Sequence, residues 1–474
     1  MTIKELNILK TNEVRQIIGD NLEATPSVFA LKNRHEAAAT IATQLKYLQR
    51  SRTKLPTFYA VQALIPPLAF EQCSSERAAS AKDFSGKTCL DLTCGLGVDS
   101  LHFSTRFQQV TAIERNFELS EAVRFNFSLM NVQNIEVINT DSHNYVHNYV
   151  GEPFDLIYLD PARRDGGGKK MFLPEDCEPN FVELWPILRT MGRKIVVKMS
   201  PMYDVDAAFR QFADVSEVGV ISIDNECKEV LLIFDNKDLI KHNKALIDND
   251  DVLINNDKTL NTQLNTPLKS SIFVKCFFKN QFFIFKNNND FNKNDNKNKL
   301  LDYSLTQNLS NNPQLNAELN KALQLNLETR KLLKLELKNV LFNELNTPLN
   351  YIVEPDVAFY KARFLEQIPP QYFDEKNTIL TASNGFLMTS NVKKTLDFPA
   401  RIFRIEAAFL YQPKRILAHL KTEKITALNV VQRNFPFSAA DIRTALRVQE
   451  GGDWFLICTV FQGEKWAWLA KRYV

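Results

Sequence analysis

The chain has 474 residues, is 45% hydrophobic and carries a formal net charge of only +3. That length implies roughly two to four domains, and the apolar fraction is enough to bury a proper core. No apolar run approaches the roughly 20 residues of a membrane-spanning helix, and the N-terminus lacks a basic segment followed by an apolar core. We therefore expect a cytoplasmic protein with no membrane segment.

The cysteines and histidines give no indication of a metal site. Seven cysteines are irregularly spaced without a Cys-x-x-Cys pair, and none of the six histidines is paired with a cysteine or an acid at ligand spacing. Irregular spacing favours reduced thiols over a disulfide framework, and the missing pair argues against structural zinc. We expect no bound metal.

Residues 1–55 are predicted to form an N-terminal helical segment. Apolar residues recur there at helical spacing, and Pro56 closes the segment. A small basic cluster lies at its end: Arg50, Arg52 and Lys54. This cluster is either a solvated helix end or a nucleic-acid contact.

Four consecutive short strands are predicted next, and an acidic residue lies at or just after the carboxyl end of each strand. The four acids are Asp91, Glu114, Asp141 and Asp160. Because the carboxyl ends of parallel strands meet at one edge of a sheet, this order predicts a nucleotide-type pocket at that edge.

The turn after the first strand decides between cofactors. Gly95 and Gly97 form a Gly-x-Gly turn, and an acid ending the second strand fits the ribose of either NAD or S-adenosylmethionine. A pyrophosphate needs a helix N-terminus that is open to it, whereas Asp99 lies early in the following helix and would repel it. S-adenosylmethionine carries a sulfonium and an ammonium group, so we predict S-adenosyl-L-methionine as the cofactor.

Each acid then has an expected role. Asp91 would anchor the ammonium group, directly or through water, Glu114 would accept both ribose hydroxyls, and Asp141 would face the adenine amine. The turn residues expected to bind the cofactor with them are Thr93, Gly95 and Gly97. The plainer alternative for Glu114 or Asp141 is a loop or helix-capping acid, and capping is an equal alternative for Asp99.

Residues 86–165 resemble a class I S-adenosylmethionine-dependent methyltransferase. The Asp-x-Thr-x-Gly-x-Gly turn is similar to that of bacterial rRNA guanine methyltransferases and cap-trimethylating enzymes. Most of the chain resembles one bacterial group, in which a ferredoxin-like segment and a C-terminal THUMP-like domain follow the methyltransferase. The motifs that carry this resemblance are Glu71-Gln72-Cys73-Ser74-Ser75-Glu76, Asp91-Leu92-Thr93-Cys94-Gly95, Asp160-Pro161-Ala162-Arg163-Arg164, Val197-Lys198-Met199-Ser200-Pro201-Met202, Asn225-Glu226-Cys227-Lys228-Glu229 and Val353-Glu354-Pro355-Asp356.

The predicted fold class is α/β: a Rossmann-like class I methyltransferase sheet with an N-terminal helical segment and C-terminal α+β domains. The resemblance implies a seven-strand sheet with one antiparallel strand. The expected division is 1–55 (helical segment), 56–235 (methyltransferase), 236–399 (ferredoxin-like α+β domain with an Asn-rich insertion) and 400–474 (THUMP-like basic domain).

The middle of the chain is rich in asparagine, which accounts for 19 of residues 241–320. Such composition is typical of insertions. Two apolar runs nevertheless predict a hairpin around Lys279-Asn280, since Asn tolerates left-handed turn geometry. We expect a disordered insertion near 286–316 and an amphipathic helix from Leu323 to Val340.

Residues 400–474 form the basic part of the chain, with twelve Lys or Arg against six Asp or Glu. This asymmetry indicates a polyanionic partner, and THUMP domains proper bind tRNA-like RNA. Ser438 is expected to cap a helix that ends at Gly451-Gly452, and a terminal hairpin should follow from Trp454 to Tyr473.

The acceptor should lie at Asp160-Pro161-Ala162-Arg163. Amino-methylating enzymes carry an Asp/Asn-Pro-Pro-aromatic signature there, in which a carboxylate or amide oxygen accepts a hydrogen bond from the acceptor amine. Asp160 would play this part and Pro161 would fix the turn, although Ala162 and Arg163 replace the second proline and the aromatic residue. The expected substrate-binding side chains are Arg163, Arg164 and Lys198.

Plainer alternatives exist for these residues too. The arginines could pair with nearby acids, and Lys198 could be a solvated strand-end lysine. Cysteines such as Cys73 and Cys94 could serve as nucleophiles for pyrimidine carbon methylation, but we expect them to be packing residues.

We predict an S-adenosylmethionine-dependent methyltransferase that acts on a base nitrogen of RNA, in rRNA or tRNA. The alternatives are a methyltransferase for a protein or a small molecule, and a non-catalytic RNA-binding protein. Retention of Asp91, Glu114, Asp141 and Asp160 argues against the last of these.

Overall fold

The structure is a computed structural model. It describes residues 1–163, 177–236, 271–278, 281–287, 350–362, 378–381, 385–390, 392, 398–461 and 463–473. The chain divides into two compact units, Met1–Phe291 and Asn292–Val474. Arg164, the helix predicted from Leu323 to Val340 and nearly all of the Asn-rich insertion lie outside the described residues.

Seven helices precede the first sheet. They are α1 (Ile3–Leu9), α2 (Asn12–Asp20), α3 (Pro26–Lys32), α4 (Ala38–Lys54), α5 (Pro56–Ala60), α6 (Pro67–Gln72) and α7 (Glu76–Ser80). Side-chain hydroxyls cap several of them; Thr2, for example, forms a capping box with Glu5. The helical prediction for residues 1–55 is confirmed.

The basic cluster at the end of α4 is used within this unit. Arg50 pairs with Glu71 and Arg52 with Glu23. The Lys54 ammonium donates to the Phe70 carbonyl at 2.6 Å. These contacts tie α4 to its neighbours, so the cluster has a structural role.

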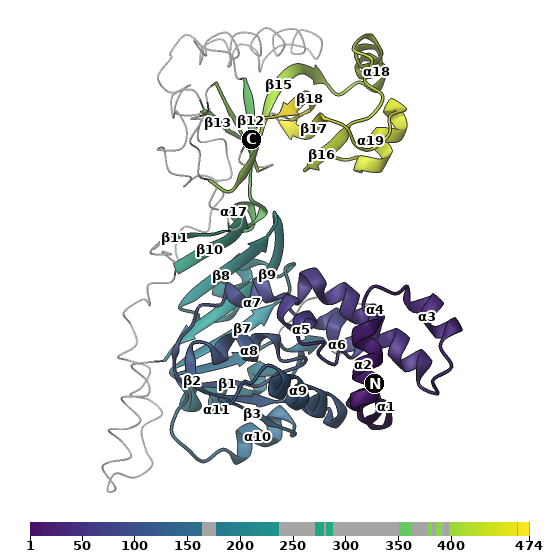
Figure 1. The fold of residues 1–474 in the computed structure, drawn as a ribbon. Helices are drawn as coiled ribbons and strands as arrows, with labels where there is room; N and C mark the ends of the chain where they lie inside the picture. The colour runs from purple at the N-terminus through teal and green to yellow at the C-terminus, as the bar shows by residue number, and fades with distance from the viewer. Residues whose placement is uncertain are drawn as a thin grey trace, which may run out of the picture. The chain divides into compact units, whose positions relative to one another are not determined.

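The first unit contains one nine-stranded sheet (Figure 1), in the order β11-β10-β8-β9-β7-β4-β1-β2-β3. The strands are β1 (Gly86–Asp91), β2 (Phe107–Ile113), β3 (Ile135–Ile138), β4 (Leu156–Leu159), β7 (Lys194–Met199), β8 (Glu217–Ile223), β9 (Glu226–Asp235), β10 (Ser271–Phe278) and β11 (Gln281–Asn287). The predicted strands are confirmed; β4 is buried throughout, whereas β3 is largely only half-buried or exposed.

Seven neighbouring strands, in the order β8-β9-β7-β4-β1-β2-β3, form the sheet that the resemblance implies. Strand β9 runs antiparallel to both β7 and β8, and the other pairings in this part are parallel. The connecting helices are α8 (Val98–Ser104), α9 (Phe117–Leu129), α10 (Ser142–Asn148), α11 (Phe181–Met191) and α12 (Val205–Gln211). The α/β fold class is confirmed.

The N-terminal helices pack against the sheet's own helices. Their apolar side chains share one core with Leu96, Val98 and Ala122 of the methyltransferase-like part. The fully buried Asn126 on α9 completes the attachment: its amide accepts the Leu64 N–H at 2.7 Å and donates to the Leu64 carbonyl at 2.8 Å. The segment before the sheet is thus fixed in place.

The hairpin predicted around Lys279-Asn280 is present, but it extends the first sheet. Strand β10 pairs in parallel with β8, and β11 closes the edge in antiparallel fashion. Gly219 makes this possible, because the ring of Phe273 occupies the space that a side chain there would fill. The expected domain boundary at residue 235 therefore falls within a continuous sheet, and a separate ferredoxin-like domain over 236–399 stays a prediction.

The second unit contains a seven-stranded sheet in the order β13-β14-β12-β15-β18-β17-β16. Its elements are β12 (Tyr351–Pro355), α17 (Val357–Lys361), β13 (Thr378–Thr381), β14 (Phe386–Thr389), β15 (Ala400–Leu410), α18 (Pro413–Thr422), β16 (Asn429–Arg433), α19 (Ala439–Leu446), β17 (Trp454–Phe461) and β18 (Glu464–Arg472). Because β12 pairs with β15, strands on both sides of residue 400 share this sheet.

Of three predictions for the C-terminal region, two are confirmed and one is wrong. Ser438 caps α19 through a capping box with Asp441, and β17 and β18 form the predicted terminal hairpin. The predicted helix end at Gly451-Gly452 is wrong. Helix α19 ends at Leu446, and Arg447 rather than a glycine takes the left-handed conformation (φ 54°) that follows it.

Candidate active site

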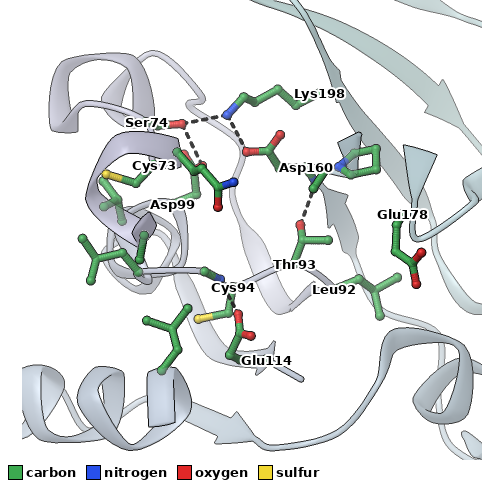
Figure 2. A pocket seen from close by; sticks show the side chains of 18 of the residues that line it. Cys73, Ser74, Leu92, Thr93, Cys94, Asp99, Glu114, Asp160, Glu178 and Lys198 are labelled. Atoms are coloured by element: carbon green, nitrogen blue, oxygen red, sulfur yellow. Dashed lines mark hydrogen bonds and ion pairs between the residues drawn. The ribbon is translucent and has the colours of Figure 1, made fainter. Parts of the chain in front are cut away.

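A cleft of about 1340 Å³ lies at the carboxyl ends of β1, β2, β4 and β7. Its lining combines three of the predicted strand-end acids, Glu114, Asp141 and Asp160, with residues that precede β1, among them Ser74. Figure 2 shows Glu114 beside the glycine turn and Asp160 beside Lys198, with Thr93 between them. The sheet edge chosen from the sequence is therefore the place where a cleft exists.

The glycine turn forms the floor of the cleft. Gly95 has a φ of 55°, and a Cβ there would meet nothing closer than the Thr93 carbonyl at 3.9 Å, so a ligand can approach its backbone. Gly97 has a different reason to be glycine. Its φ is 82°, and a Cβ would lie 2.7 Å from the Phe127 ring, so it permits close packing of α8 on α9.

Asp91 holds this turn from below. Its carboxylate accepts the Thr93 N–H at 3.0 Å and the hydroxyl of Ser100. It is 1% exposed and does not line the cleft. Burial raises the pKa of Asp91 to about 7. The geometry gives Asp91 a role in shaping the turn, and its contact with a cofactor ammonium group stays a prediction.

Glu114 connects the second strand to the turn. One carboxylate oxygen accepts the Gly95 N–H at 3.0 Å and the other accepts the Asn116 N–H at 2.8 Å. Burial raises the pKa of Glu114, and these two backbone N–H groups offset part of that effect. The side chain is half-buried and lines the cleft, as a ribose-binding acid should.

Asp141 caps α10 and also lines the cleft. Its carboxylate accepts the N–H groups of His143 and Asn144. The helix-capping alternative is therefore correct for Asp141, and its expected contact with adenine stays a prediction. Next to it, the Ser142 hydroxyl donates to the Leu92 carbonyl at 2.7 Å and ties α10 to the turn.

Asp160 and Pro161 lie opposite the glycine turn, at the end of β4. The Asp160 N–H donates to the Thr93 hydroxyl at 2.6 Å, so Thr93 links the turn to the predicted acceptor site. The Asp160 side chain is 32% exposed. Both Asp160 and Pro161 line the cleft, together with Lys198, Met199 and Pro201 of the segment that begins in β7.

Lys198 pairs directly with Asp160. Its ammonium lies 2.5 Å from Asp160 Oδ2, 3.0 Å from the Ser74 hydroxyl and 3.8 Å from Glu229 Oε1. The prediction that Lys198 lies at the same edge as Asp160 is correct. The side chain is only 13% exposed, so the alternative of a solvated lysine is wrong.

A group of buried polar side chains lies behind this pair; we call Ser74, Lys82, Asp99 and Glu229 the anchor cluster. The Lys82 ammonium is 2.9 Å from Asp99 Oδ1 and 2.6 Å from Glu229 Oε2. The Ser74 hydroxyl is 2.9 Å from Glu229 Oε1 and 3.2 Å from Asp99 Oδ2. Lys82 has no exposed side-chain surface and Glu229 only 3%, so these contacts are shielded from solvent.

Asp99 is therefore not a helix cap. Burial opposes its ionisation, but the ammonium groups of Lys82 and Lys198 outweigh that effect and lower the pKa of Asp99. Its charge is compensated by Lys82, which weakens the sequence argument that Asp99 would repel a pyrophosphate. The net charge of the site still favours a cation, because Asp99, Asp160 and Glu229 face only two lysines there.

Of the two arginines expected to bind substrate, the structure describes only the backbone of Arg163. The backbone of Arg163 belongs to β5 (Ala162–Arg163), which pairs with β6 (Cys177–Glu178). Arg164 lies outside the described residues. A cation that sequence reasoning missed, Arg115, lines the cleft and pairs with Glu178 at 3.1 Å.

The structure offers no arrangement for a metal within the described residues, where no three His, Cys, Asp or Glu side chains are grouped to hold one. None of the described helices is long and apolar enough to cross a membrane.

Two family models match the chain. Residues 69–172 match the family described as Conserved hypothetical protein 95, and residues 400–472 match the family described as THUMP domain-like. The first match contains the glycine turn, Glu114, Asp141 and Asp160. The second begins at the expected start of the basic domain.

A crystal structure of a candidate methyltransferase from Porphyromonas gingivalis W83 is similar over 98% of both chains, with a TM-score of 0.67 and 21% sequence identity. The chain has the class I methyltransferase fold. The expected THUMP-like character of the C-terminal region agrees with the family model that matches residues 400–472.

Three curated methyltransferases align with parts of the chain. An uncharacterized RNA methyltransferase of Mycoplasma mobile is 30% identical over 31% of this chain. Ribosomal RNA small subunit methyltransferase J of Acinetobacter baylyi is 29% identical over 35% of this chain and 72% of its own length. A 23S rRNA (uracil(1939)-C(5))-methyltransferase of Vibrio campbellii is 26% identical over 35% of this chain. The chain spans 34% of the Mycoplasma relative and 38% of the Vibrio relative.

Proposed function

We propose that this chain is an S-adenosylmethionine-dependent methyltransferase that methylates a base nitrogen of RNA, in rRNA or tRNA of the cytoplasm. One observation carries the proposal: Glu114, Asp141 and Asp160, each from a different strand end, line a single cleft around the open glycine turn. The RNA methyltransferases among the curated relatives support the substrate class.

The residues present fit the proposed cofactor. Gly95 leaves its backbone open to a ligand, Glu114 offers carboxylate oxygens beside it, and the cleft carries an excess of carboxylates suited to a cation. Glu114 would bind the ribose hydroxyls and Asp141 the adenine edge. When bound, S-adenosylmethionine would supply a methyl group, which leaves sulfur as the new bond to the acceptor nitrogen forms.

The chain's own contribution is mainly positioning, since alignment of the reacting atoms can supply most of the acceleration. Asp160 would accept a hydrogen bond from the acceptor amine and hold its lone pair toward the methyl group. Pro161 would fix the backbone that presents this oxygen. The methylated nitrogen would be left with a surplus proton, which would pass to water in the cleft after the transfer, so Asp160 need not remove it beforehand.

The thiols favour nitrogen over carbon as the acceptor. Methylation at a pyrimidine carbon would need a reactive thiolate, yet burial raises the pKa of Cys73 to about 11 and also raises that of Cys94. A third cysteine of the cleft, Cys177, is half-buried. We expect Cys177→Ser to retain methyl transfer, and loss of transfer in that variant would move the acceptor from nitrogen to carbon.

The test is transfer of labelled methyl groups from S-adenosylmethionine to total RNA. RNA from cells that lack the protein should accept label, whereas RNA from normal cells, already modified, should accept little. Label that is released by ribonuclease supports the proposal. Label that is released by protease or found in small molecules would support the alternative acceptors, and no label in any fraction would contradict a methyltransferase function.

A further inference from the structure

We propose that Lys198 is a positioning residue for Asp160 rather than a ligand for substrate phosphate. The inference rests on the proposed function, because it concerns how the acceptor-binding carboxylate is held. It also assigns a role to the anchor cluster, which holds the Lys198 side chain in place through Ser74 and Glu229. The sequence predicts a substrate-binding role for this lysine, whereas the structure gives its ammonium group partners within the chain.

The contacts of the ammonium group carry the first step. An ammonium has three N–H donors. Asp160 and Ser74 accept from it at 2.5 and 3.0 Å, and Glu229 Oε1 lies 3.8 Å away. These three partners surround a side chain that is 13% exposed. A phosphate that approached Lys198 would meet the negative charges of Asp160 and Glu229 and would have to compete with the charge-assisted hydrogen bond to Asp160.

The anchor cluster limits where Lys198 can go. Glu229 faces Lys198 with one carboxylate oxygen and Lys82 with the other. The Ser74 hydroxyl accepts from Lys198 and lies within hydrogen-bond distance of Glu229. Moving Lys198 would therefore leave a carboxylate that is 3% exposed with one cation fewer, which is costly in a buried site.

The arrangement leaves one oxygen of Asp160 for the substrate. Lys198 binds Oδ2, and the backbone N–H of Asp160 is held by Thr93. No described residue forms a hydrogen bond with Oδ1, and the side chain is partly exposed to the cleft. Lys198 thus orients the carboxylate so that Oδ1 is presented to an acceptor amine.

The pair also sets the charge of Asp160. The charged or titratable groups that act on this carboxyl come from several elements: Lys198 on β7, Asp99 on α8, Glu229 on β9, Asp91 on β1 and Tyr158 on β4. Lys82, after α7, pairs with Asp99 and Glu229. Burial raises the pKa of Asp160, and Lys198 opposes this rise. Without Lys198, the carboxyl would face Asp99 and Glu229 with a weaker counter-charge, and its pKa would rise further.

The decisive experiment is a titration of the Asp160 carboxyl by NMR in full-length chains carrying ¹³C-carboxyl aspartate. The Asp160 signal is identified by its disappearance in Asp160→Asn. We expect Lys198→Met to raise the Asp160 pKa by about one to three pH units, the range for removal of an adjacent opposite charge. Lys198→Arg should largely restore the wild-type value. The matched control is Lys194→Met on the same strand, where the lysine pairs with Asp235 at 3.7 Å and the Asp160 signal should not change.

Turnover provides the second readout. The acidic limb of kcat/KM should move to higher pH in Lys198→Met by the same amount as the carboxyl titration. In an Asp160→Asn background, adding Lys198→Met should change the pH profile little, because an amide does not titrate. The comparison of Asp160→Asn with the double variant Asp160→Asn/Lys198→Met remains informative if Lys198→Met alone folds poorly. The double variant removes both charges of the Asp160–Lys198 ion pair, so neither of the two is left without its partner.

The inference and the proposed function can fail separately. An unchanged Asp160 titration in Lys198→Met would overturn the inference whether or not the chain methylates RNA. A higher KM for RNA with an unaltered pH profile and a weaker salt dependence would also overturn it and restore the phosphate contact. Absence of RNA methylation by the wild type, with the titration shifted as expected, would overturn the proposed function alone.

Discussion

Glu114 Oε2 lies 3.0 Å from the Gly95 nitrogen and so joins the end of the second strand to the glycine turn that follows the first. The same carboxylate accepts the Asn116 N–H, which starts the loop into α9. A single side chain thus fixes both backbone segments that border the proposed ribose position. Its role is to shape the cleft as well as to bind the cofactor.

Replacement of Glu114 should therefore weaken cofactor binding strongly. Removing hydrogen bonds to a charged group costs about 1.5–3 kcal/mol, so we expect Glu114→Ala to raise the Kd for S-adenosylmethionine about 10- to 100-fold. Isothermal titration calorimetry measures this directly. Glu118→Ala is the matched control, because Glu118 is another half-buried acid of the cleft lining. Equal affinities of the Glu114 variant and the wild type would refute the ribose-binding role.

Asp160 should matter for turnover and little for cofactor binding. We expect Asp160→Ala to abolish methyl transfer, because it removes the oxygen presented to the acceptor, while the Kd for S-adenosylmethionine changes less than about threefold. Asp160→Asn should keep part of the activity, since an amide oxygen also accepts a hydrogen bond. Single-turnover transfer assays at saturating cofactor separate the two effects. Wild-type turnover in Asp160→Ala would remove this residue from the mechanism.

Asp91 should give the chain a pH-dependent stability. Its pKa is raised from 3.8 to about 7 in the fold, so the folded chain keeps a proton that the unfolded chain releases between about pH 4 and pH 7. The stabilisation is present at the acidic end of this window and is lost as pH rises through it, with a slope of up to about 1.4 kcal/mol per pH unit. Asp91→Asn keeps partners for Thr93 and Ser100 and should remove this slope.

Denaturant unfolding of the full chain at several pH values across that window tests the assignment. The wild type should lose stability toward neutral pH more steeply than Asp91→Asn. Parallel curves for the two proteins would mean that Asp91 is ionised in the fold, which would favour a direct contact with a cofactor ammonium group.

The basic C-terminal domain is best tested by charge reversal. Removing residues 400–474 would separate β12 from β15 and expose a sheet edge, so a truncation would not isolate the charge effect. Lys414 and Arg415 are exposed at the start of α18. We expect Lys414→Glu/Arg415→Glu to lower the slope of log Kd for RNA against log salt by about 0.7–0.9 for each phosphate that the domain no longer neutralises. Lys4→Glu/Lys32→Glu, on exposed lysines of the N-terminal helices, should leave the slope unchanged.

The strand-end acids were predictable because a buried strand followed by an acid is a local pattern. Glu114 and Asp160 are half-buried in the cleft where that pattern placed them. The same pattern did not distinguish Asp91, which lies beneath the turn, or Asp141, which caps a helix. These differences depend on which N–H groups donate hydrogen bonds to each carboxylate. A strand followed by an acid does not specify those hydrogen bonds.

The anchor cluster could not be predicted from local pattern. Ser74 and Glu229 are 155 positions apart in the sequence, and the buried hydrogen bond between them produces no periodic pattern in either segment. The available signals were that Ser74 and Glu229 lie in motifs that carry the resemblance and that Glu229 precedes a strongly apolar run. The position of the hairpin β10–β11 was missed for a similar reason, because the sequence predicted its two strands but not the sheet edge on which they pair.

The most direct test of the central claim is mass spectrometry of nucleosides from RNA of cells that lack this protein, complemented with either the wild-type chain or Asp160→Ala. We predict that one nucleoside methylated at a base nitrogen is absent in the deficient cells, returns with the wild type and stays absent with Asp160→Ala. An identical set of methylated nucleosides in all three samples would contradict the account.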